Sequence, residues 1–207
     1  MSVENTLPPV LALTMGDVNG VGPEILAKAL ARPEPWRWCR PVVFGSVRAL
    51  DEARRFAPEC PSPVSVADVA AALAVKDAVP VVEWGVTVPA PRPGVLDPQA
   101  GGAAVVWIEA AVREAMAKRI AGMVTCPISK ECIIQAGCAH TGHTTLIAAM
   151  TGAPDYRMCL FTDTMRIVHI TAHLSLRNAI DSVRKDRILR TINIAHAALR
   201  RMGMARP

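Results

Sequence analysis

The stretch from 120 to 146 constrains the fold of this chain more than any other. An apolar run (120–124) ends shortly before Pro127, Gly137 interrupts the next segment, and a polar cluster (140–145) precedes another apolar segment. A buried strand, a proline-led helix, a glycine stop and a polar loop that opens a second helix are typical of α/β proteins. Ligands of such proteins bind beyond the carboxyl ends of the strands, where helix N-termini offer free N–H groups to anions. An ordinary strand–helix–helix connection would give the same pattern.

The flanking sequence predicts further strands and helices of an α/β fold. Short apolar runs indicate strands, and apolar residues at helical spacing indicate helices. We expect strands at 10–15, 41–46 and 121–126, a hairpin of 158–161 with 166–171, and helices from Pro23 and over 47–56, 101–120 and 186–202. The loop GDVNGVG has its glycines at 16, 20 and 22, which is not the G-x-G-x-x-G spacing of a dinucleotide-binding Rossmann domain. Glycine there suits a structural turn as well as a ligand-binding loop.

Composition excludes several functional classes. The 207 residues are 51% hydrophobic and carry a formal charge of +5. The basic residues form no long run, which favours a solvated surface over a nucleic-acid interface. The six cysteines form no C-x-x-C pair, as expected for reduced thiols in a cytoplasmic protein. We find neither a signal peptide nor an apolar stretch of the roughly 18 residues that a transmembrane helix needs.

The segment HITAH, from His169 to His173, does not fit a zinc protease. That motif is H-E-x-x-H on a helix, but Ile170 stands in the position of the glutamate and the segment resembles a strand. Residues four apart in a strand are separated by about 13 Å, too far to share one metal. His173 is a candidate ligand because it lies where the strand is expected to end, whereas His169 is a structural candidate.

Four segments together carry a family resemblance. TMGDVNGVGPEI, TCPISK, GHTT and TAHLSLR occur in this order along the chain. They resemble the 4-hydroxythreonine-4-phosphate dehydrogenase family, which includes the related D-threonate and D-erythronate 4-phosphate dehydrogenases. The resemblance implies an α/β fold with an isocitrate/isopropylmalate dehydrogenase-like sheet and flanking helices. The chain departs from the family's pattern at Val18 and Asn19, at Thr145 in place of a glutamate, and at Ser175 in place of a proline.

The resemblance also implies a site. His143 and Thr144 match residues that bind substrate, and His173 matches one of three histidines that bind a divalent metal (Zn, Mg, Mn or Co). Lys130 matches a family lysine by position, without a proton-transfer role, and no catalytic residue is assigned. The implied cofactor is NAD, with NADP as the alternative, and the implied assembly is a homodimer with a shared active site.

The implied reaction is the NAD-dependent, metal-assisted oxidative decarboxylation of 4-phosphohydroxy-L-threonine in pyridoxal 5'-phosphate (vitamin B6) biosynthesis. D-threonate or D-erythronate 4-phosphate is the alternative substrate. Family members are longer, so we expect residues 1–207 to be the N-terminal portion of a two-domain enzyme, with a crossover near 89–100. Two metal histidines, the catalytic lysine and much of the nucleotide pocket would then be lacking. His196 is the only histidine after His173, and it is not counted as a metal ligand because it falls in a helix. A non-catalytic ligand-binding remnant is the alternative from another class.

Overall fold

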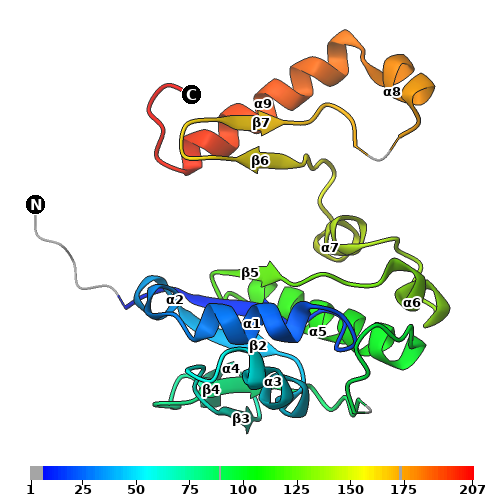
Figure 1. The fold of residues 1–207 in the computed structure, drawn as a ribbon. Coiled ribbons are helices and arrows are strands. Elements are labelled where there is room, and N and C mark those ends of the chain that lie inside the picture. Colours follow the sequence, from blue (N-terminus) through cyan, green and yellow to red (C-terminus); the bar gives the residue numbers. More distant parts are fainter. Residues whose placement is uncertain (1–6, 89, 173) are drawn as a thin grey trace, which may run out of the picture. The chain divides into compact units, whose positions relative to one another are not determined.

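A computed structural model describes residues 7–88, 90–172 and 174–207 of the chain (Figure 1). The chain divides into two compact units, Met1–Gly152 (unit 1) and Ala153–Pro207 (unit 2). Within the described residues, no helix is both long and apolar enough to cross a membrane. The range 89–100, where the sequence suggested a crossover, falls inside unit 1.

Unit 1 is built on a five-stranded parallel sheet of order β3-β4-β2-β1-β5. Its strands are β1 (Val10–Thr14), β2 (Arg40–Phe44), β3 (Pro63–Val66), β4 (Val79–Val82) and β5 (Gly122–Thr125). The predicted α/β fold and the three predicted strands of this sheet are confirmed. Thr14 lies opposite Phe44 on one side and Thr125 on the other, so β1, β2 and β5 end level at one edge.

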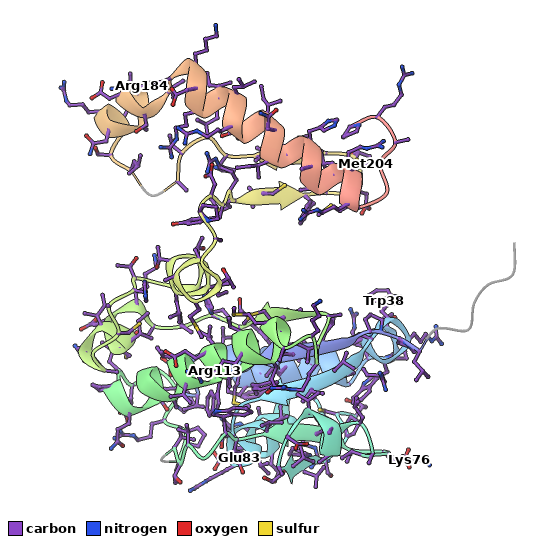
Figure 2. All side chains as sticks on the ribbon, turned by 180° about the vertical axis from the view of Figure 1, so that it is seen from behind. Trp38, Lys76, Glu83, Arg113, Arg184 and Met204 are labelled. Atoms are coloured by element: carbon purple, nitrogen blue, oxygen red, sulfur yellow. The ribbon has the colours of Figure 1, made fainter. Side chains whose placement is uncertain are left out.

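Helices cover both faces of this sheet. In Figure 1 α1 (Gly22–Leu30) lies in front of the strands, and in the reverse view of Figure 2 the long helix α5 (Pro98–Met116) lies in front. α3 (Val47–Ala53) packs on α1 and continues as the 3-10 helix η1 (Arg54–Phe56), while α6 (Lys130–Gln135) and α7 (His143–Thr151) pack on α5. The short helices α2 (Pro33–Trp38) and α4 (Val69–Ala72) complete the unit.

Small residues on α5 allow close packing on the sheet and on α6. Its alanines at 100, 103, 104, 110 and 111 are buried beside Trp107. A Cβ on Gly101 would lie 2.5 Å from the backbone carbon of Cys132 in α6, so only glycine permits this approach. The sequence therefore fixes where α6, and with it the following loop, lies against α5.

Several details of unit 1 differ from the sequence-based expectation. α5 spans Pro98–Met116 rather than 101–120. It begins early because the Asp97 carboxylate accepts a hydrogen bond from the Gln99 N–H at 2.9 Å. α6 begins at Lys130 rather than at the proline, since the Ser129 hydroxyl caps it. β5 was expected to be buried but is partly exposed, with Val124 at 54%, because it is the last strand of the described sheet.

Unit 2 contains a hairpin and two helices. β6 (Cys159–Phe161) pairs antiparallel with β7 (Arg166–Val168), which confirms the predicted hairpin, although β7 is shorter than expected. α8 (Leu176–Ser182) precedes the predicted C-terminal helix α9 (Lys185–Arg201), which Arg184 and Met204 bracket in Figure 2. Among the described residues of this unit Thr191 alone is buried, so the unit has little core of its own.

Candidate substrate-binding site at the ends of β1 and β5

The strand order of unit 1 places a switch point between β1 and β5. The chain leaves β1 through α1 towards β2 on one side, and it later enters β5, on the other side of β1, through α5. Two loops therefore leave the same edge in opposite directions: 15–21 after β1 and 126–129 after β5. In open α/β sheets the crevice outside such strand ends is where ligands bind.

Backbone contacts join these two loops directly. The Cys126 N–H donates to the Thr14 carbonyl at 3.0 Å, and the Asp17 N–H donates to the Pro127 carbonyl at 3.1 Å. Gly16 lies between them with a φ of +71°, and a Cβ there would lie 2.2 Å from the Pro127 oxygen. Glycine is therefore required at position 16 by both its backbone angle and the space available.

Asn19 holds a third loop, 92–95, at this junction through the hydrogen bonds that we call the Asn19 clamp. Its amide nitrogen donates to the Val95 carbonyl at 3.1 Å, and its amide oxygen accepts from the Arg92 N–H at 2.8 Å. The Asn19 carbonyl also accepts from the Gly94 N–H at 2.8 Å. This loop leads into α5, so a side chain in the first loop holds the entry to the helix against which α6 and α7 pack.

Two carboxylates beside this clamp have opposite protonation tendencies. Burial raises the pKa of Asp17, with a further contribution from Asp97, while the Asn19 N–H opposes the shift. The pKa of Asp97 is lowered by the Gln99 N–H and by Arg92, which lies 2.9 Å away. The Asp97 carboxylate thus stays charged at the N-terminus of α5, where the helix dipole also favours an anion.

α7 begins at the predicted substrate-binding residues and has a free N-terminus. Gly142 is its N-cap and offers no side-chain hydrogen bond to the first turn. Thr144 is exposed in that turn, and the Thr145 hydroxyl donates back to the Gly142 carbonyl at 3.2 Å. The first N–H groups of an α-helix have no partner inside the helix, so this end of α7 can receive an anion such as a phosphate.

The imidazole of His143 is held at the same end. Its Nε2 is buried and has no hydrogen-bond partner in the described structure. Burial lowers the pKa of His143, and the backbone of Cys126 acts in the opposite direction. The ring is therefore neutral at physiological pH and has one nitrogen free for a ligand. Cys126 itself is buried, which raises the pKa of its thiol to about 11 and makes it a poor nucleophile.

The structure brings His143 and Thr144 together in unit 1 but leaves the metal assignment untested. His173 lies outside the described residues. Lys130 is exposed at the start of α6. His169 lies in unit 2, where its backbone N–H donates to the Met158 carbonyl and its ring Nε2 is buried without a partner in the described structure. Among the described residues, no three His, Cys, Asp or Glu side chains come close enough to hold a metal ion.

Sequence reasoning missed the roles of Asn19 and Asp97. The Asp97-Pro98 pair is a helix-start signal that would have found the cap. No local signal marks Asn19, because its partners lie 73 and 76 residues away along the chain.

A parallel sheet whose loops converge at the β1/β5 switch point, beside the free N-terminus of α7, defines an α/β protein with its ligand crevice at the strand ends. Comparison with known proteins identifies the family within this class. Residues 37–207 match the family described as "Pyridoxal phosphate biosynthetic protein PdxA". The chain belongs to this family.

Relatives with two different names resemble the chain. A D-threonate 4-phosphate dehydrogenase of Cupriavidus necator is 35% identical over 203 residues, which cover 96% of this chain and 60% of the relative. A 4-hydroxythreonine-4-phosphate dehydrogenase of Desulfosudis oleivorans is 37% identical over 213 residues, covering 96% of this chain and 59% of the relative. The chain thus spans about 60% of the length of these curated relatives.

Solved structures agree with the fold. A 4-hydroxythreonine-4-phosphate dehydrogenase from Klebsiella pneumoniae matches with a TM-score of 0.84 and 32% identity over 99% of this chain and 62% of that chain. One from Burkholderia phymatum has the same TM-score at 29% identity, over 98% of this chain and 61% of that chain.

Proposed function

We propose that this chain provides the substrate-binding site of an NAD-dependent dehydrogenase acting on a 4-phosphorylated hydroxy acid. The reaction proposed first is the oxidative decarboxylation of 4-phosphohydroxy-L-threonine in pyridoxal 5'-phosphate biosynthesis. The observation that carries the proposal is the free N-terminus of α7 beside the buried, unpartnered Nε2 of His143. Two different groups can bind there at once: a phosphate on the helix N–H groups and a hydroxyl on the imidazole.

The roles of the two side chains follow from their chemistry. The Thr144 hydroxyl can donate to a phosphate oxygen in the same turn whose N–H groups are free. The neutral His143 ring can accept a hydrogen bond from a substrate hydroxyl, which would orient the carbon to be oxidised. The partial burial of His143 would keep water away from this bond.

D-threonate 4-phosphate is the second candidate substrate, because several relatives are named as dehydrogenases of that compound. The two substrates share the phosphate and the adjacent hydroxyl, and they differ in carrying an amino group or a hydroxyl at the next carbon. The features described around α7 would bind what they share, so turnover of each compound with NAD and with NADP decides between them. D-erythronate 4-phosphate belongs in the same comparison.

The metal and the assembly remain predictions from the resemblance. The described residues do not themselves form a metal site. In the full-length form, His173→Ala is expected to abolish metal-dependent turnover, and retained metal and activity would contradict that assignment. A homodimer is expected, which sedimentation analysis would test.

Binding of the phosphorylated substrate tests the proposal separately from turnover. We expect Thr144→Val to weaken binding by roughly tenfold, since a hydrogen bond to a charged group contributes about 1.5 kcal/mol or more. Thr151→Val at the other end of α7 is the matched control, because its hydroxyl bonds within the helix to the Ile147 carbonyl at 2.8 Å. Binding without turnover would favour the non-catalytic remnant, and equal binding by both variants would contradict the site.

A further inference from the structure

A cavity of about 870 Å³ lies at the carboxyl ends of β2, β3 and β4. Val82, the last residue of β4, lies opposite Phe44 of β2 on one side and Val66 of β3 on the other, so the three strands end level. The cavity is lined by residues 46 and 48 after β2, 65–67 at the end of β3, and 83–88 after β4. A cavity of this size at the strand ends of an α/β sheet is a typical place for a small-molecule ligand.

The carboxylate of Glu83 is fixed at the wall of this cavity (Figure 2). One of its oxygens accepts from the Val47 N–H and the other from the Ser65 hydroxyl, both at 3.2 Å. Its backbone carbonyl accepts from the Trp107 indole N–H at 3.0 Å. Since each carboxylate oxygen can accept two hydrogen bonds, both keep capacity for a ligand donor. Glu83 is therefore a held acceptor for two neighbouring hydroxyl groups.

The backbone at Trp84 is strained where it borders the same cavity. Trp84 has a φ of +55° and is followed by Gly85 with a φ of +70°. A bulky residue seldom adopts a positive φ, and residues held in this way cluster at ligand sites. Trp84 packs on the core beside Phe44, with ring centroids 6.2 Å apart, and also lines the cavity. An indole in such a wall offers a flat surface on which a base can stack.

Arg48 supplies a positive charge to the cavity lining. Its side chain is 62% exposed and pairs with Glu52 at 2.9 Å, one turn further along α3. An exposed pair of this kind contributes little to stability, so the guanidinium can turn to a phosphate at small cost. The cavity thus combines an acceptor for two hydroxyls, a flat ring and a cation.

We propose that this cavity binds the nucleoside part of a ribonucleotide. The Glu83 carboxylate accepts from the 2'- and 3'-hydroxyls of the ribose, the base stacks on Trp84, and Arg48 binds the phosphate. An acidic residue binds the ribose in the same way in dinucleotide-binding folds. The nucleotide is either the NAD of the dehydrogenase, a role that rests on the proposed function, or a separate free nucleotide.

Calorimetric titration of the full chain with AMP and with 2'-deoxy-AMP tests the ribose contact without any turnover. We expect the wild type to bind AMP roughly tenfold more tightly, because the deoxy compound lacks one hydrogen bond to a charged acceptor. Glu83→Gln should weaken AMP binding by about tenfold and remove most of this preference, since an amide nitrogen cannot accept. Glu34→Gln, exposed on α2 and outside the cavity, makes the same change of charge and should bind AMP as the wild type does. The proposal is overturned if AMP does not bind, or if Glu83→Gln binds it as tightly as the wild type.

Arg48→Gln tests the phosphate contact at an exposed position, where the fold is not at stake. It should weaken binding of AMP and leave binding of adenosine unchanged. Equal loss for both compounds would contradict the role of Arg48.

Competition identifies the source of the nucleoside. Displacement of AMP by NAD assigns the cavity to the cofactor, and AMP binding that NAD does not affect assigns it to a free nucleotide. If 4-phosphohydroxy-L-threonine fails to bind the chain, the proposed function fails, whereas the comparison of AMP with 2'-deoxy-AMP still decides on this cavity.

Discussion

Replacing Asn19 by alanine should destabilise unit 1 through a loop 73 or more residues away. The side chain is 4% exposed and makes two hydrogen bonds, to the Arg92 N–H and to the Val95 carbonyl. Each bond contributes about 0.5–1.5 kcal/mol net, so their joint loss should lower the free energy of unfolding by about 2 kcal/mol. The corresponding drop in melting temperature is roughly 4–8 °C.

Tryptophan fluorescence during urea unfolding is the appropriate assay. All four tryptophans lie in unit 1, so the signal reports on this unit: Trp36, Trp38, Trp84 and Trp107. Hydrogen exchange at the Arg92 amide should quicken in the same variant, because that amide loses its acceptor. An unfolding free energy within about 0.5 kcal/mol of wild type would refute the clamp, since that is the usual range for substitutions without a special role.

Asn19→Asp separates hydrogen bonding from charge. The carboxylate can still accept from the Arg92 N–H but faces the Val95 carbonyl without a proton, close to the buried Asp17. Burial would raise the pKa of the new carboxyl above its unfolded value of about 3.9. The variant should therefore be less stable than Asn19→Ala at pH 7 and should recover as the pH falls through that raised pKa. A stability difference from wild type that does not change with pH would contradict this reasoning.

Three further predictions concern the same unit. Gly16→Ala should lower the free energy of unfolding by about 3 kcal/mol or more, because the new Cβ would lie 2.2 Å from a carbonyl oxygen at a residue with positive φ. Gly20→Ala is the control: its Cβ would lie 3.4 Å from the nearest atom, so the loss should be about 1 kcal/mol or less. Urea unfolding of both variants measures the difference. Asp97→Asn should lower the free energy of unfolding by about 1 kcal/mol at pH 7, because the charged cap of α5 is lost. The pKa of Asp97 is depressed in the folded chain, so the wild type should lose this advantage as the pH falls through that pKa. Unfolding curves of both proteins at several pH values would show this convergence. Cys126 should resist alkylation at pH 8 in the folded chain, since its thiol is buried with a pKa of about 11. Mass spectrometry of peptides measures the alkylation rate of each cysteine. Alkylation of Cys126 as fast as that of the partly exposed Cys138 and Cys159 would contradict this prediction.

The fold was predictable from the sequence where its signals are local. The apolar runs at 10–15 and 41–46 and the spaced apolar residues of 186–202 correspond to β1, β2 and α9. Boundaries failed where a side chain redefined a helix start, as Asp97 does for α5 and Ser129 for α6. Burial of β5 was overestimated because the sequence gives hydrophobicity, not the position of a strand in a sheet.

The site was predictable only in part, and for a different reason. The polar cluster 140–145 before an apolar segment indicated that a helix begins there, and a helix N-terminus is a place for an anion. The assignment of His143 and Thr144 to a substrate came from the family resemblance. The hydrogen bonds between the loops at the ends of β1 and β5 join segments distant in sequence, and no single-sequence pattern encodes those partners.

These long-range bonds imply that the site forms only with the whole sheet. The junction of Gly16 with the Pro127 carbonyl requires β1 beside β5, and the Asn19 clamp requires the segment between β4 and α5 to be in place. Neither contact can persist when the sheet opens. The amide of Asp17, which donates to the Pro127 carbonyl from a loop, should therefore exchange with solvent almost as slowly as the amides of β1, unlike an ordinary surface loop. Fast exchange at this amide, with the β1 amides protected, would show that the site opens by itself.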